Sequence, residues 1–421
     1  MKGFPMIGAS RAMPLSRRTP FYALMAANLI SQLGSMLTMI ALPWFVLQTT
    51  GSAAKAGITL AVDALPIAVA GIFAGALVDR VGLKRSSVFS DLGSGLFVAA
   101  IPLLYHLDML AFPTLLELVF LSSLCNQPGA TARRSLLPDL ADRAGIPLEC
   151  ANSLSQAMPR LALLLGPPLG GLLIVLVSTS NTLWLDALSF AISAAIVAVM
   201  IPLIRNETPQ SSGNYLDDIR AGLQFLRQDP VLFWLILTFS FGSLVAEPLY
   251  SIVLPVYARQ VYGSSVQLGL LYSALAGGSL MGLAFYALFG QRLPSRLLIL
   301  GGFAARVLAF SVLSALPAFP LALVAIAFES VVFEPINPLF SVFLQRRTPS
   351  ELRGRVFGLV SAIGAGTLPI GTLIGGLLLS SAGLAVTMVI ITVASTVHLL
   401  GIFLIPAFRG MDAPAPVVAF N

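Results

Sequence analysis

Several charged side chains lie within long apolar stretches of the sequence, where a charge is costly to place. A charge at the centre of a lipid bilayer costs about 2.5–3.5 kcal/mol on insertion scales, so charges at such depth are usually functional. A carboxyl group in apolar surroundings favours its protonated form, and a change in those surroundings can release the proton. We expect Glu329, Asp63 and Glu247, in that order, to couple proton movement to substrate movement. The other expected members of this cavity are Glu334, Glu117 and Arg160.

Each of these charges also has a structural interpretation, in which a permanent partner holds it for helix packing. Arg160 is as well suited to be the counter-ion of one of the acids as to contact a substrate. Asp91 and Asp186 lie near the ends of apolar segments, where packing or gating explains them better, and Arg306 could pair with either. From its depth, Arg160 is expected to matter more for stability than Asp186.

Twelve apolar segments, which fill almost the whole chain, must position these residues. The composition is 57% hydrophobic and 10% charged, with a mean hydropathy of +0.92, whereas a soluble domain has about 25% charged residues. A helix needs about 20 apolar residues to cross a hydrocarbon core about 30 Å thick. Such long runs without alternation exclude barrel strands, so the sequence predicts an all-α membrane protein. The predicted segments are 21–48, 54–78, 86–107, 110–132, 150–178, 182–204, 230–258, 265–290, 294–316, 319–344, 354–380 and 384–407.

The basic residues predict how these segments are oriented. Twenty of the 24 Lys and Arg residues lie in the terminal stretches, the central gap or every second gap between segments. Only Lys55 and Arg259 lie in the gaps of the other side. By the positive-inside rule, both termini and the central gap are expected to be cytoplasmic. The same distribution accounts for the net charge of +6 without a nucleic-acid-binding function.

A repeated motif divides the chain into two related halves. Residues 166–173 read GPPLGGLL and residues 371–378 read GTLIGGLL, at the same place within each half. A duplicated six-helix bundle is the build of many secondary transporters, with the substrate site between the halves. We expect bundles at 1–204 and 230–421, joined by a linker at 205–229. Close helix packing by small residues is the expected role of Gly166, Pro167, Gly170, Gly171, Gly371, Gly375 and Gly376.

Residues 75–85, GALVDRVGLKR, are expected to form a turn after the second segment. Asp79 can accept hydrogen bonds at the start of segment eleven, where residues 348–351 read TPSE, a helix-capping sequence. The run resembles the signature loop of the major facilitator superfamily, G-x-L-x-D-R-x-G-x-K-R, although a generic basic turn is the alternative. The resemblance implies a gate that closes the cytoplasmic side when the outer side is open. The expected gate residues are Gly75, Asp79, Arg80, Gly82, Lys84, Arg85 and Arg353.

Several further runs resemble one bacterial branch of this superfamily, which includes macrolide efflux pumps and the enterobactin exporter. They include RSLLPD at 134–139, LDALSF at 185–190 and RGRVFG at 353–358. The resemblance implies a proton-coupled exporter of lipophilic or amphipathic compounds, which works by alternating access in the bacterial inner membrane, in contact with its lipids. A lysophospholipid or siderophore carrier on the same fold is the alternative.

Other function classes lack the residues that they need. The sequence has no G-x-x-x-x-G-K-[ST] loop, which excludes ATP hydrolysis in this chain as the driving force. Its two cysteines and two histidines have no metal-binding spacing, so we expect no metal and no cofactor. A membrane-embedded enzyme would need clustered histidines, paired acids or a nucleophile with its base. Charges at mid-depth in both halves favour transport over a non-transporting sensor, and we expect a monomer.

Overall fold

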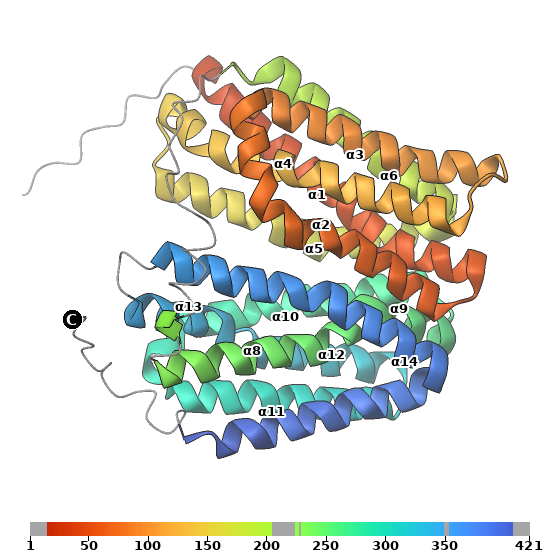
Figure 1. Cartoon of the computed structure of the whole chain (residues 1–421), viewed down its shortest axis with the longest axis vertical. Helices are drawn as coiled ribbons and strands as arrows, with labels where there is room; N and C mark the ends of the chain where they lie inside the picture. The colour runs from red at the N-terminus through yellow and green to blue at the C-terminus, as the bar shows by residue number, and fades with distance from the viewer. Residues whose placement is uncertain (1–14, 204–223, 227–228, 349–352, 407–421) are drawn as a thin grey trace, which may run out of the picture.

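In the computed structural model, the described part of the chain comprises residues 15–203, 224–226, 229–348 and 353–406. All regular secondary structure in these residues is helical (Figure 1). Serine caps begin several helices: Ser52 accepts from the Lys55 N–H at the start of the second helix. The helices of the first half are α1 (Leu15–Thr50), α2 (Ala53–Val81), α3 (Leu83–His106), α4 (Phe112–Ala144), α5 (Leu148–Val177) and α6 (Thr179–Met200).

The second half begins with α8 (Pro230–Pro248), which Asp229 caps by accepting hydrogen bonds from two backbone N–H groups. The same stretch continues through two π-helical turns, η1 (Leu249–Val253) and η2 (Ala258–Tyr262), on either side of α9 (Leu254–Tyr257). The remaining helices are α10 (Ser265–Phe289), the 3₁₀ turn η3 (Gly290–Arg292), α11 (Ser295–Ser314), α12 (Phe319–Phe333), α13 (Ile336–Arg347) and α14 (Arg353–Leu404).

The helices are long and apolar, as a membrane protein requires. Within the described residues, nine helical stretches have the length and composition to cross a membrane. Helices α2 and α4 are not among the nine, and α14 supplies one stretch that contains a break at Gly383, where φ is 75°. The break agrees with the gap predicted between segments eleven and twelve. Many large apolar side chains face outward, such as Val199 at 83% exposed, which fits a surface that lipid covers.

Helix α4 extends further than the sequence analysis predicted. It runs to Ala144 rather than to position 132, so Arg133, Arg134 and Arg143 belong to a helix and not to a gap. The helix ends at Gly145, which adopts a left-handed conformation with φ of 63°. Lipid does not limit the helix length, because a helix can continue into water beyond the hydrocarbon core.

The run at 75–85 is mostly helical rather than a loop. Helix α2 reaches Val81 and α3 begins at Leu83, so only Gly82 interrupts the helical backbone. Gly82 has a φ of 90°, a conformation that glycine adopts without the steric penalty of a side chain. The turn between α2 and α3 is therefore as tight as the motif requires.

Helices α1–α6 pack against one another, as do α8–α14, and the two groups lie one above the other in Figure 1. Two helix pairs make most of the contacts between the groups: α2 with α14, and α5 with α10. We call the end of the bundle where α1 begins the terminal side, and the other end the opposite side. Figure 1 shows that α2 and α14 lie side by side on the opposite side and separate toward the terminal side.

The buried apolar clusters follow the same division. One cluster joins both halves and contains side chains near the opposite side, among them Ile40 and Phe45 of α1, Leu254 of α9 and Leu268 of α10. A second cluster, which includes Phe21 and Leu136, belongs to the first half alone. Two further clusters belong to the second half alone. The halves therefore share a core on the opposite side and have separate cores on the terminal side.

Candidate functional site

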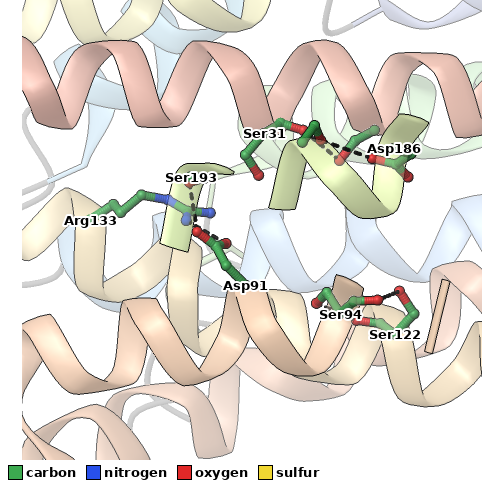
Figure 2. Close-up of polar contacts among 9 residues, drawn as sticks. Ser31, Asp91, Ser94, Ser122, Arg133, Asp186 and Ser193 are labelled. Carbon is green, nitrogen blue, oxygen red and sulfur yellow. Dashed lines mark hydrogen bonds and ion pairs between the residues drawn. The ribbon is translucent and has the colours of Figure 1, made fainter. Parts of the chain in front are cut away.

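A buried ion pair in the first half joins three helices. Arg133 of α4 donates from Nη1 to Asp91 Oδ1 of α3 at 2.7 Å, and Ser193 of α6 donates to Asp91 Oδ2 at 2.6 Å. Figure 2 shows Arg133 and Ser193 both pointing at the Asp91 carboxylate, with Ser94 and Ser122 in contact between α3 and α4. Because both carboxylate oxygens have donors, Asp91 holds helices together and is not free to bind a ligand.

Two further acids of the first half accept hydrogen bonds from hydroxyl groups. Asp186 of α6 is 1% exposed and accepts from Thr38 of α1 and from Ser189. Asp63 of α2 accepts from Ser123 of α4. Asp63 is only partly buried and belongs to a helix that contacts the other half, so it is the more accessible of the two.

The second half contains its own buried ion pair. Arg306 Nε of α11 lies 3.0 Å from Glu329 Oε1 of α12, and the guanidinium group lies 3.5 Å from the centroid of the Phe333 ring. Both charged side chains are buried. The expectation that Arg306 pairs with Asp91 or Asp186 is therefore wrong, because those acids lie in the other half and α12 is the neighbour of α11.

Glu334 and Arg160 interact across the boundary between the halves. Glu334, directly after α12, accepts a hydrogen bond from Ser279 of α10 at 3.2 Å. Arg160 of α5, whose side chain is exposed, is near enough to influence Glu334 electrostatically, but in the described part of the chain the two form no ion pair of 4.0 Å or less. Glu247, near the end of α8, is partly exposed and lies beside Gly371 of α14. Of the predicted cavity residues in these helices, Asp63, Glu247 and Glu334 are partly exposed and Arg160 is exposed.

The remaining predicted residues lie elsewhere. Glu117 is exposed on α4. Arg80 and Arg85 are exposed on either side of the Gly82 turn, and Lys84 is partly exposed. The side chains of Gly75, Asp79 and Arg353, residues 349–352 and most of the predicted linker at 205–229 lie outside the described residues, so the gate stays a prediction.

The repeated glycine motif makes equivalent contacts in the two halves. Gly166 of α5 lies against Met36 of α1, and Gly371 of α14 lies against Glu247 of α8, the first helix of its own half. The second glycine of each motif packs against the same neighbouring stretch as the first glycine does. Gly170 lies against Leu37 and Ile40, and Gly375 lies against Pro248 and Ile252.

The third glycine of each motif contacts the other half. Gly171 lies against Ser265 of α10, whose hydroxyl donates to the Gly171 carbonyl at 2.8 Å. Gly376 lies against Gly57 of α2, so closely that a Cβ on Gly57 would be 2.7 Å from the Gly376 Cα. Beside the contact of Gly171 with Ser265, α5 and α10 also approach closely: a Cβ on Gly269 would be 2.3 Å from the Pro167 carbonyl oxygen. Backbones of the two halves therefore touch at two crossings, both on the opposite side.

Sequence reasoning missed the roles of Arg133 and Ser193. It placed Arg133 in a basic gap, because the apolar run ends at position 132. The next glycine that can end a helix is Gly145, and a helix drawn to that point contains Arg133. One turn earlier, Gly129 lies against Ser90 of α3, which marks the face of α4 that meets α3.

The sequence of the chain is similar to those of known transporters. Residues 24–366 match the sequence model of the Major Facilitator Superfamily. The chain is 33% identical to the multidrug efflux pump Tap of Mycolicibacterium fortuitum, over 94% of this chain and 98% of that protein. It is 24% identical to macrolide efflux protein A of Streptococcus pyogenes, over 85% of this chain and 88% of that protein.

Solved structures of similar fold include two transporters of low sequence identity. The nucleoside transporter NupG has a TM-score of 0.74 at 12% identity, covering 93% of this chain and 99% of that one. A bacterial homologue of the iron transporter ferroportin, in an inward-facing state, has a TM-score of 0.71 at 15% identity. The match covers 93% of this chain and 98% of that one. At these identities the likeness shows a shared fold alone.

Proposed function

The chain belongs to the major facilitator superfamily, and we propose that it exports lipophilic or amphipathic compounds from the cytoplasm in exchange for protons. As a member of that family with several apolar helices, it is a multi-pass protein of the bacterial inner membrane. The observation that carries the proposal is the 33% identity to the Tap multidrug efflux pumps over 94% of this chain. The similarity to macrolide efflux protein A supports the same class of substrate.

The proposed topology has twelve membrane spans, two six-helix bundles at 1–204 and 230–421, and both termini in the cytoplasm. The equivalent contacts of the two glycine motifs and the break at Gly383 support twelve spans. The concentration of basic residues on the terminal side supports a cytoplasmic location for that side. We propose that a monomer is the working unit, in contact with membrane lipids and small-molecule substrates.

In this topology the structure corresponds to an inward-facing state. The shared apolar core and both backbone crossings lie on the opposite side, which would be the outer side. Separate cores on the terminal side leave the two halves free to part there. Alternating access would then open the crossings of Gly57 with Gly376 and of Gly171 with Ser265, and close the predicted gate around Asp79 and Arg353.

The proposed coupling site is formed by the accessible charges near the boundary of the halves. Glu334 is the strongest candidate, since it is partly exposed and lies near Arg160 of the other half, with which, among the described residues, it forms no ion pair of 4.0 Å or less. Asp63 and Glu247 are also accessible. Glu329, the first choice from the sequence, can take part only in a cycle that opens its ion pair with Arg306.

Dye and macrolide efflux from cells that express the chain tests this proposal. We expect expressing cells to extrude ethidium and erythromycin, and a protonophore to abolish the extrusion. Asp63→Asn should impair extrusion, whereas Glu117→Gln, the same loss of charge at an exposed site on α4, should not. Absence of extrusion for every lipophilic cation and macrolide, with the protein present in the membrane, would refute drug export.

A further inference from the structure

A pocket of about 370 Å³ lies at the opposite side of the first half. It is lined by the end of α1, the start of α2, the end of α3 and the start of α4, together with the turn between α3 and α4. Its walls include three aromatic rings, from Phe45, Tyr105 and Phe112, and two charged side chains, Lys55 and Asp108. Ligand pockets commonly measure about 300–1,000 Å³, so this one can hold a small molecule or a head group.

The two charges of this pocket are exceptional for their side of the protein. Lys55 is one of only two basic residues, among 24, that the sequence places there. Asp108 is the only charged residue in the turns between helices on this side, all of which the structure describes (51–52, 107–111, 178, 263–264, 315–318 and 383). Lys55, one of the two basic residues of this side, and Asp108, the one charged residue of its turns, therefore line the same pocket.

Lys55 and Asp108 line the same pocket without neutralising each other. Within the described part of the chain, neither residue takes part in an ion pair of 4.0 Å or less. The Lys55 ammonium group lies 5.2 Å from the centroid of the Phe112 ring. Phe45 and Tyr105 form an adjacent aromatic wall, with ring centroids 5.0 Å apart. A cation and an anion held apart beside aromatic rings suit a ligand that carries both signs of charge.

The surface next to the pocket is apolar. Leu107 and Met109, which flank Asp108, are 56% and 67% exposed, and Tyr105 is 41% exposed. Exposed apolar and tyrosine side chains at the end of a membrane helix are typical of the level of the lipid head groups. A lipid of the adjacent leaflet can therefore reach the pocket with its head group.

We propose that this pocket binds the head group of a zwitterionic phospholipid. The phosphate group contacts the Lys55 ammonium group, and the ammonium group of the lipid contacts the Asp108 carboxylate and the face of the Tyr105 ring. An anionic lipid would satisfy Lys55 but would leave Asp108 opposite a negative charge, so the pocket discriminates against it. The pocket is thus a lipid site on the opposite side of the first half.

Lipid binding to the purified full-length protein tests the proposal. Native mass spectrometry would count phosphatidylethanolamine and phosphatidylglycerol retained from an equal mixture in detergent. We expect phosphatidylethanolamine to predominate, and Lys55→Gln or Asp108→Asn to weaken its binding about tenfold. Arg259→Gln removes the other basic residue of this side, which does not line the pocket, and should leave binding unchanged.

The outcomes separate the lipid from a soluble ligand and from a folding defect. Lys55→Arg keeps the charge and should keep the binding, so loss in Lys55→Gln would not reflect misfolding. If millimolar phosphoethanolamine displaces the lipid, the charge recognition stands and a soluble zwitterion can use the site. Equal retention of the two lipids by the wild type, or wild-type retention of phosphatidylethanolamine by both charge variants, would overturn the proposal.

Discussion

At the scale of single residues, the charges of this protein fall into two groups that should respond differently to mutation. Asp91 with Arg133 and Glu329 with Arg306 are buried pairs inside one half. Asp63, Glu247 and Glu334 are accessible near the boundary of the halves. Removing one partner of a buried pair leaves the other charge without compensation, whereas removing an accessible acid does not.

Replacing Asp91 by Asn should lower the free energy of unfolding by about 3–5 kcal/mol, because Arg133 would remain buried without a counter-charge. Unfolding in mixed micelles, followed by circular dichroism, measures the loss. Glu117→Gln, which removes an exposed acid from α4, should change stability by less than about 0.5 kcal/mol. Equal stabilities of the two variants would show that the buried pair does not hold α3 and α4 together.

Glu329→Gln and Glu334→Gln should separate stability from coupling. Glu329→Gln leaves Arg306 buried without its partner, so the melting temperature should fall. Glu334→Gln removes a partly exposed acid, so the melting temperature should stay near that of the wild type while proton-driven export is lost. Melting curves and export assays on the same preparations compare them. Full export by Glu334→Gln would remove Glu334 from the coupling site.

The structure reverses the expected order of two alanine variants. Asp186→Ala should lower the melting temperature more than Arg160→Ala does, because Asp186 is 1% exposed and accepts from two hydroxyl groups. Those hydroxyls would lose their acceptor in a buried place, whereas Arg160 is exposed. Thermal unfolding in detergent measures both. A larger loss for Arg160→Ala would favour the ranking by depth in the bilayer.

At the scale of helices, the two crossings of the halves depend on the absence of side chains. Gly57→Leu should prevent the close approach of α2 and α14, since even a Cβ at Gly57 would be 2.7 Å from the Gly376 Cα. We expect the variant to favour a state that is open on the opposite side. Labelling of cysteines introduced on that side, at Thr50→Cys and Ser381→Cys, measures the opening.

The control for this variant lies in the same helix as Gly376. Gly364→Ala adds a side chain where nothing lies within 4 Å, so the labelling should match that of the wild type. Its stability should be equal or higher by up to about 1 kcal/mol, because alanine favours a helix over glycine. Wild-type labelling of Gly57→Leu would mean that the crossing does not control opening.

The positions of the helices along the chain were more predictable from the sequence than which helices pack against each other. The bilayer demands long apolar runs, so the observed helices overlap the predicted segments, and even Gly383 falls in a predicted gap. Apolar runs do not reveal where a helix continues into polar sequence, which is why α4 was predicted to end before Arg133. The partner of Arg306 depends on which helices become neighbours, and no local pattern contains that information.

At the scale of the whole molecule, the two glycine motifs give the protein an internal symmetry. In each half, the first glycine of the motif contacts the first helix of its own half, and the third glycine contacts a helix of the other half. Both crossings lie on the side where the halves share one apolar core. A symmetric pair of contacts on one side can open together when the halves rock against each other, as the proposed alternating access requires.

In the proposed cycle, inward movement of protons drives outward movement of a substrate. The most direct test reconstitutes the purified protein in liposomes, imposes a pH gradient across the membrane and follows the movement of ethidium. We expect ethidium to accumulate on the acidic side, a protonophore to collapse the accumulation, and Glu334→Gln to lose uphill movement. Ethidium that equilibrates without accumulating, at the same rate with and without the gradient, would contradict proton-coupled export.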